Sequence, residues 1–334
     1  MRDEFFTRTY RIHTAIVKIC TNSLPWLERV DEGMLLPEDN SRSLADIKLS
    51  LLVKDPEAIQ KDIPLPDSRF QQDEYDLLLD HPVHVTIYRN EHETWSLLGD
   101  LGIIWKDYRR GQGMGIRYQD QMLDPVYEQI LFLQGPLAKL LFKKQMCKIH
   151  ASGVVVSGRG IIFSGLSGKG KSTAAYALLR RKHRVLSDES ILVFRNGQQY
   201  SGLSISDVIK IQSEAARLFF PELIDSPSCH KVGEEWYLHL NSLPGLPYQH
   251  SAPVSVLAIL EKTGESGSYA EKISPHRVMN DFLPITLDPY EPVSIMKERF
   301  TFLMSFLNSV QCYLVHFGTD MDQFGQTIER MGEG

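Results

Sequence analysis

The sequence has little cysteine, no long apolar run and no excess of positive charge. The few cysteines are far apart and show no CxxC spacing, so they indicate neither a zinc site nor a disulfide framework. No apolar run approaches the roughly 20 residues that span a bilayer, and the first residues do not have the apolar core of a signal peptide. We therefore expect a cytoplasmic protein with free thiols at four positions: Cys20, Cys147, Cys229 and Cys312.

The charge balance argues against two classes of partner. The chain has 36 Lys and Arg against 42 Asp and Glu, which gives a formal net charge of -6. Such a chain has no electrostatic reason to bind nucleic acid or an anionic membrane, so neither partner is expected. With 334 residues, 43% of them hydrophobic, it is long enough for two domains that each bury a core. The sequence leaves a homo-oligomer open.

Residues 1–122 are expected to form a mainly β domain, and substrate recognition is a candidate role for it. Short runs such as 14–19 and 84–88 are typical of strands and lack a helical period. A glycine cluster at 111–115 resembles a dinucleotide-binding loop, but Ile116 stands where that motif needs a glycine. We interpret this cluster as a flexible turn.

The sequence pattern becomes helical at Asp124-Pro125, which is a favourable N-cap followed by a favourable first helical residue. Apolar residues then recur at helical spacing, with a break expected at Gly135-Pro136. The domain boundary is therefore predicted near residue 123, and a second domain is predicted over 123–334.

A phosphate-binding loop follows the buried strand predicted at 161–163 and precedes a predicted helix. Its pattern, G-x-x-x-x-G-K-[ST], is that of a P-loop, whose backbone N–H groups and helix N-terminus surround nucleotide phosphates. Lys171 would place a cation on the β- and γ-phosphates of ATP, and the Ser172 hydroxyl would bind Mg²⁺. The residues expected to hold the nucleotide are Gly165, Leu166, Ser167, Gly168, Lys169, Gly170, Lys171, Ser172 and Thr173.

Two carboxylates follow the next predicted strand, at Asp188 and Glu189. Carboxyl ends of parallel strands meet at one edge of a sheet, so both acids are expected near the loop. Asp188 could accept a proton from an acceptor hydroxyl, and Glu189 could hold Mg²⁺ directly or through water. The alternative is a turn with solvated acids. His150, before the strand that precedes the loop strand, is either structural or part of the site.

Three stretches together resemble the catalytic core of the HPr kinase/phosphorylase family: His150–Val156, Gly160–Thr173 and Leu186–Glu189. The loop style G-x-S-G-x-G-K-[ST] is shared by that family and by ATP-dependent phosphoenolpyruvate carboxykinase. The resemblance implies an α/β P-loop kinase domain of this type with ATP and Mg²⁺. It also implies that Asp188 is the acid/base residue for a seryl hydroxyl and that His150 is the histidine before the loop. Glu189 stands where the family has a second aspartate.

Two departures from the family change the expected acceptor. The later signature of the family is at best a remnant at 202–207, and the N-terminal half does not resemble that of HPr kinases. The chain is more similar to stand-alone HPr-kinase-related proteins found with ribosomally made peptides, including serine kinases of lasso-peptide precursors. This favours a serine kinase whose acceptor is a peptide or small protein other than HPr. Alternatives are a nucleotidyltransferase, a small-molecule kinase and a non-catalytic ATP sensor.

Further elements are expected in the C-terminal half. Strands are predicted at 207–211 and 312–315, and helices at 213–219, from Ser274-Pro275 to about 282, and at 296–307. Three cations could meet phosphates or a substrate carboxylate, although most such residues are solvated: Lys210, Lys231 and Arg277.

Overall fold

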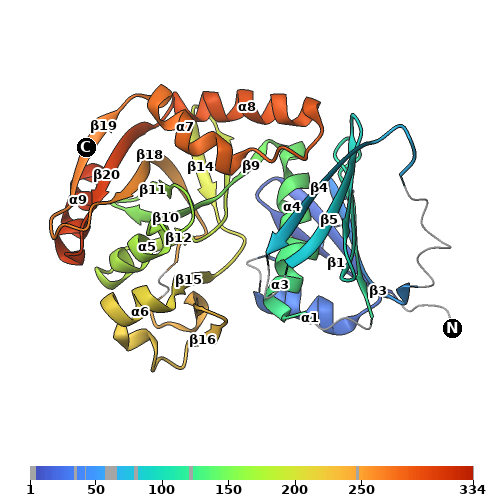
Figure 1. The fold of residues 1–334 in the computed structure, drawn as a ribbon, viewed down its shortest axis with the longest axis horizontal. Coiled ribbons are helices and arrows are strands. Elements are labelled where there is room, and N and C mark those ends of the chain that lie inside the picture. Colours follow the sequence, from blue (N-terminus) through green and yellow to red (C-terminus); the bar gives the residue numbers. More distant parts are fainter. Residues whose placement is uncertain are drawn as a thin grey trace. The chain divides into compact units, whose positions relative to one another are not determined.

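The computed structural model describes residues 5–33, 36–41, 43–56, 66–78, 82–119, 123–245 and 248–333. Within these ranges the chain is a mixed α/β protein with three sheets, and it divides into two compact units (Figure 1). The first unit comprises Met1–Cys147 and Asp288–Arg299, and the second comprises Lys148–Leu287 and Phe300–Gly334. No helix in the described ranges is long and apolar enough to cross a bilayer.

The first unit is built on an eight-stranded sheet in the order β1-β2-β3-β8-β7-β6-β5-β4. Strand β3 is parallel to β2 and β8, and the other neighbours are antiparallel. The strands predicted at 14–19 and 84–88 are confirmed as β2 and β5. The bounds are β1 Phe6–Ile12, β2 Ala15–Thr21, β3 Ile47–Lys54, β4 Gln71–Leu78, β5 Pro82–Arg89, β6 Glu93–Leu98, β7 Gly102–Asp107 and β8 Gln112–Tyr118.

Helices of the first unit include a long helical segment after the sheet. Asp124 caps it as predicted, because its side chain accepts a hydrogen bond from the Val126 N–H at 2.8 Å. The predicted break at Gly135-Pro136 is wrong. A π-helical turn in which the Gly135 N–H reaches the Ile130 carbonyl carries the helix through. The helical bounds are α1 Leu24–Gly33, α3 Pro125–Gln129, π-helix η1 Ile130–Gln134, α4 Gly135–Leu140 and 3₁₀ helix η2 Leu141–Lys144.

The glycine cluster explains why this helical segment belongs to the first unit. Gly113 and Gly115 lie inside β8, so the predicted flexible turn is wrong except around Gly111. A Cβ at Gly113 would lie 2.8 Å from Leu140 Cδ1, and one at Gly115 would lie 2.9 Å from the Phe132 carbonyl oxygen. The bare backbone thus lets the helices pack directly on the sheet. The first unit therefore extends to Cys147, beyond the boundary that was predicted near residue 123. Residues 120–122, next to that predicted boundary, lie outside the described ranges.

The second unit contains a nine-stranded sheet and a three-stranded sheet. In the larger sheet the order is β12-β10-β11-β18-β14-β13-β9, with β20 paired to β18 and β19 paired to β20, and the smaller sheet has the order β15-β17-β16. The bounds are β9 Met146–Ile149, β10 Ala151–Val156, β11 Arg159–Ser164, β12 Arg184–Ser187, β13 Ile191–Asn196, β14 Gln199–Leu203, β15 Val208–Gln212, β16 Cys229–Val232, β17 Glu235–His239, β18 Ser251–Lys262, β19 Tyr269–Ile273 and β20 Gln311–Phe317.

The helices of the second unit cover these sheets. Figure 1 shows α5 close to β10 and β12, with the yellow segment of α6 and β15 next to it. Helix α9 packs Phe324 between Phe163 and Phe317, with ring centroids 6.2 and 4.4 Å apart. The bounds are α5 Lys171–Arg180, α6 Ser213–Phe219, η3 Pro221–Leu223, η4 Leu240–Ser242, α7 Pro275–Thr286, α8 Val293–Leu307, whose first residues belong to the first unit, and α9 Met321–Glu333.

Most sequence-based predictions for the second unit are confirmed. Strands β10 to β12, β15 and β20 and helices α5 to α8 form where they were expected, and Ser274 caps α7. Helix α6 has the predicted bounds 213–219, and Gln212 is its N-cap. All four cysteines are free thiols.

Candidate functional site: a phosphate-binding loop beside a buried aspartate

The strand directions of the second unit bring the loop and the two acids to one sheet edge. Strand β10 lies between β11 and β12 and is antiparallel to both. Therefore β11 and β12 end at the edge where β10 begins, and the loop, Asp188 and His150 meet there. The sequence predicted from the strand ends of a parallel sheet that the two acids lie near the loop, and it left His150 open. The sheet is mixed, but β10 enters from the same edge. Strands β18 and β20 are parallel to one another and to β11, and they also end there.

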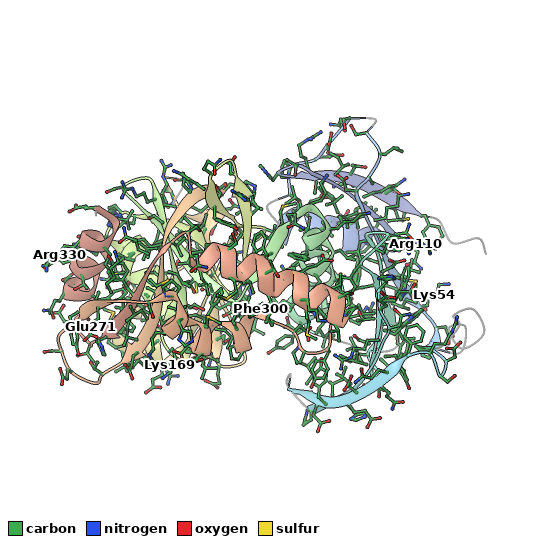
Figure 2. All side chains as sticks on the ribbon, turned by 90° about the horizontal axis from the view of Figure 1, so that it is seen from above. Lys54, Arg110, Lys169, Glu271, Phe300 and Arg330 are labelled. Atoms are coloured by element: carbon green, nitrogen blue, oxygen red, sulfur yellow. The ribbon has the colours of Figure 1, made fainter. Side chains whose placement is uncertain are left out.

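The loop follows β11 and closes directly onto the first residue of α5. Gly165, Gly168 and Gly170 have positive φ angles of 143°, 78° and 95°. At Gly170, which caps α5, a Cβ would lie 2.6 Å from a ring carbon of Phe317, so this position needs glycine for space as well as for its φ. The N-terminus of a ten-residue helix thus opens onto the loop, an arrangement that favours a bound anion. Figure 2 labels Lys169 of this loop, at the edge of the second unit.

Lys171 is folded back over the loop. Its Nζ donates hydrogen bonds to the carbonyl oxygens of Gly165 at 2.9 Å and Leu166 at 3.2 Å, and the side chain is buried. Burial lowers the pKa of Lys171, and the negative charges of Glu189 and Asp188 oppose that shift. The ammonium is therefore held within the loop, where a phosphate would meet it.

Asp188 is the most deeply buried ionisable group at this edge, with 3% of its surface exposed. Its Oδ1 accepts hydrogen bonds from Ser152 Oγ and from Ser172 Oγ, the latter at 3.0 Å. Its Oδ2 accepts one from the Lys210 backbone N–H at 2.9 Å. Burial and then the nearby Glu189 charge raise the pKa of Asp188 to about 6, although these hydrogen bonds act in the opposite direction. The alternative of a solvated acid is wrong for Asp188.

His150 and Glu189 form a second pair at the same edge. His150 Nδ1 lies 2.9 Å from the Glu189 carbonyl oxygen and 3.7 Å from its Oε2. Because a carbonyl only accepts, the proton is on Nδ1, and in the neutral ring Nε2 is left as an acceptor. Burial lowers the pKa of His150, while the Glu189 carboxylate opposes the shift. Glu189 has a φ of 63°, a left-handed conformation that is uncommon for glutamate.

A cavity of about 680 Å³ opens at the loop. This volume lies within the range of roughly 300–1,000 Å³ that is typical of small-molecule sites. The cavity is lined by polar and apolar side chains of the loop, α5, β15, α6, β17 and the segments after β18 and β20. The lining residues include Ser167, Gly168, Gly170, Lys171, Ser172, Thr173, Glu189, Lys210, Lys262 and Phe317.

The predicted site residues divide into two groups. Six of the nine predicted loop residues line the cavity. Gly165, Leu166 and Lys169 belong to the loop without lining it. Asp188 and His150 lie behind the cavity wall and reach it through Ser172 and Glu189. Of the three candidate cations only Lys210 is among the lining residues, and Lys231 and Arg277 are not.

Sequence reasoning missed several residues of the site. Ser152, whose hydroxyl donates to Asp188, stands two residues after His150 in the motif, but nothing in the sequence shows that this hydroxyl contacts an acid that follows another strand. Lys262 and Phe317 reach the cavity because β18 is the parallel neighbour of the loop strand β11, and β20 is in turn the parallel neighbour of β18. No local sequence pattern predicts these strand pairings.

The donor set at the loop fits a magnesium nucleotide. Mg²⁺ prefers oxygen ligands and is commonly held by one or two carboxylates together with substrate phosphates. The hydroxyl of Ser172 and the carboxylates of Asp188 and Glu189 supply such oxygens, and the helix N-terminus and Lys171 supply the positive groups for phosphates. Within the described ranges no group of three or more His, Cys, Asp and Glu is arranged to hold a metal ion.

Fold and site together define a mixed α/β protein in which a glycine-rich loop joins a buried strand to a helix. No family model matches the chain. The chain is 42% identical over 55 residues to the HPr kinase/phosphorylase of Mycoplasmopsis pulmonis. These 55 residues are 16% of this chain and 18% of that protein. Thus the resemblance to HPr kinase/phosphorylase that the motifs predict is confirmed over this length. The match spans about a fifth of the curated relative.

A solved structure gives a second comparison. The HPr(Ser) kinase/phosphatase of Coxiella burnetii aligns with 56% of this chain and 95% of its own, at 14% identity and a TM-score of 0.29.

Proposed function

We propose that this protein is an ATP-dependent kinase that transfers the γ-phosphate of ATP to a serine hydroxyl of a peptide or small protein. The observation that carries the proposal is the hydrogen bond between the loop serine, Ser172, and the buried Asp188. This contact supports the proposal, because a P-loop would hold the end of a triphosphate next to its serine. A carboxyl whose pKa is raised to about 6 is well suited to accept a proton near neutral pH.

Each site residue has a role in this proposal. Lys171 binds the β- and γ-phosphates, and the loop N–H groups and the start of α5 hold the remaining phosphate oxygens. Ser172 and Glu189 hold Mg²⁺, which when bound neutralises part of the phosphate charge. Burial lowers the pKa of His150 and so favours its neutral form, and Nε2 orients the acceptor hydroxyl.

The proposed transfer step conserves atoms, electrons and protons. The acceptor oxygen attacks the γ-phosphorus and gives its proton to Asp188. The bond from the γ-phosphorus to the bridging oxygen breaks, and ADP leaves with the electron pair. The products are a phosphoserine and ADP, and the protonated Asp188 returns its proton to solvent. No other co-reactant is required.

The choice of acceptor is supported by the resemblance. The Mycoplasmopsis relative is named for HPr, a protein substrate, which favours a polypeptide acceptor here. The match leaves most of that relative uncovered, and the chain resembles the stand-alone HPr-kinase-related proteins more, so we propose a precursor peptide of the lasso type or a similar peptide.

The experiment is to incubate the protein with ATP, Mg²⁺ and an extract of the source cells. The extract is then separated into polypeptides and small molecules, and phosphate is located by mass spectrometry. We expect phosphoserine in a polypeptide, lost with Lys171→Ala and kept with Lys231→Ala, which removes an exposed lysine away from the cavity. Label confined to small molecules would instead indicate a small-molecule kinase. Bound ATP without transfer would indicate a sensor.

A further inference from the structure

Ser152 stands out among the groups around Asp188, because it is completely buried and does not line the cavity. It is the second residue of β10, and its hydroxyl donates to Asp188 Oδ1. The site roles above leave Ser152 without a function.

The three donors to Asp188 differ in how free they are. Ser172 lines the cavity, and in the proposed kinase its hydroxyl turns to Mg²⁺ when the nucleotide binds. The Lys210 N–H is fixed by the backbone of β15 and holds Oδ2. Only Ser152 then remains on Oδ1. One fixed donor on each oxygen sets the orientation of the carboxylate, and the position left by Ser172 is on Oδ1, the oxygen that contacts this cavity-lining serine.

A neighbouring serine shows that this pairing is not a general feature of the sheet. Ser164, on the adjacent strand β11, is also completely buried, but its hydroxyl has no hydrogen-bond partner among the residues that the structure describes. Burial alone therefore does not account for the contact between Ser152 and Asp188.

We infer that Ser152 is a positioning residue, which fixes the Asp188 carboxylate so that its cavity-facing lone pair can take the acceptor proton. The inference rests on the proposed kinase function. The hydroxyl acts through Asp188 and touches neither nucleotide nor acceptor. Because its hydrogen bond favours the ionised carboxylate, it also opposes the upward pKa shift that burial causes.

The test compares Ser152→Ala with Ser164→Ala in two measurements. In the first, the Asp188 carboxyl is titrated by ¹³C NMR without nucleotide or acceptor, and Asp188→Asn assigns its signal. We expect the pKa of Asp188 to rise in Ser152→Ala and to stay in place in Ser164→Ala. An unchanged pKa in Ser152→Ala would overturn the inference. This result does not depend on whether the protein is a kinase.

The second measurement is the pH profile of γ-phosphate transfer. Loss of a hydrogen bond to a charged group should lower the rate of Ser152→Ala about ten-fold at pH 6, with a smaller loss above pH 8 where the carboxyl is ionised in both proteins. Ser152→Thr, which keeps the hydroxyl, should restore the acid limb. A loss that is equal at every pH would mean that Ser152 only supports the fold. Should the alanine variant not fold, Ser152→Cys, a weak donor of similar size, replaces it. A wild-type protein without transfer would overturn the proposed function, and the NMR result would still decide the role of Ser152.

Discussion

Asp188 in the second unit and Asp288 in the first unit are both removed from much of the solvent, yet their pKa values move in opposite directions. Burial raises the pKa of Asp188 to about 6, and the Glu189 charge adds to the shift. Burial opposes ionisation of Asp288 as well, but the Lys139 ammonium in contact with it prevails and lowers the pKa to about 2. Asp288 has a cationic partner, whereas Asp188 has two hydroxyls, one N–H and an acidic neighbour.

This contrast separates a structural charge from a reactive one. Next to Asp288, Arg299 and Glu291 form an almost completely buried ion pair at 2.8 Å, so each of these two charges, like that of Asp288, has an oppositely charged partner. Asp188 is left ready to gain a proton near neutral pH, and it adjoins a cavity through Ser172. Perturbed acids beside cavities are typical of functional sites.

The largest expected effect comes from replacing Asp188, the aspartate with the raised pKa. Asp188→Asn keeps the shape of the side chain but cannot accept the proton, so transfer should fall by about 10²–10⁴-fold. ATP affinity, measured by calorimetry, should change little, because Lys171 and the loop remain. Asp288→Asn is the matched control and should keep the transfer rate. Normal transfer by Asp188→Asn would remove this residue from the mechanism.

The next largest effect is a loss of stability when the buried ion pair near Asp288 is broken. Glu291→Gln leaves the buried Arg299 guanidinium without its anionic partner, which typically costs about 3–5 kcal/mol of unfolding free energy. Denaturant titration of the variant beside the wild type measures this loss, and Asp188→Asn serves as the comparison. A variant as stable as the wild type would show that the pair is dispensable for folding.

The pH dependence of stability should have opposite signs at the two aspartates. An aspartate ordinarily titrates near 4. Because the pKa of Asp188 is raised to about 6, its ionisation disfavours the folded state, and this cost grows as the pH rises from about 4 to about 6. The pKa of Asp288 is lowered to about 2, so its stabilising contribution is present above about pH 4 and is lost as the pH falls through about 2.

Unfolding titrations over this pH range check both signs. Asp188→Asn should gain stability relative to wild type between pH 4 and 7, and the deficit of Asp288→Asn should shrink between pH 4 and 2. The same trend for both variants would refute the contrast.

The smallest expected effect sharpens the account of Asp188. Glu189→Gln removes the like charge but leaves the burial, so the pKa of Asp188 should fall by only part of its shift. A ¹³C carboxyl titration measures the change. In parallel, Lys139→Met should raise the pKa of Asp288, because its main cation is lost. If the pKa of Asp188 is unchanged in Glu189→Gln, its upward shift is caused by burial alone.

Local signals in the sequence were sufficient for much of the second unit. The strand, loop and helix around Lys171 depend on neighbours in the chain, as does the hairpin turn at Asn196-Gly197. The position of Asp188 near the loop also follows from strand ends. The polarity of β10 and the pairing of Ser152 with Asp188 depend on residues far apart in the sequence, and no local pattern carries them.

The same limit explains the errors in the first unit. Gly113 and Gly115 have the composition of a turn, but they lie in a strand because Leu140 and Phe132 pack against them. The domain boundary was predicted near residue 123 because the sequence pattern changes there from strand to helix. The helices after Asp124 nevertheless complete the first unit, since what they bury lies on the preceding sheet.

Label transfer tests the central claim most directly. The wild-type protein, Lys171→Ala and Asp188→Asn are incubated with Mg²⁺, an extract of the source cells and ATP labelled on either the α- or the γ-phosphate. We expect the γ label alone to enter a polypeptide with the wild type, and neither variant to transfer it. Transfer of the α label would contradict the kinase and indicate nucleotidyl transfer, and undiminished γ transfer by Asp188→Asn would contradict the role of the buried aspartate.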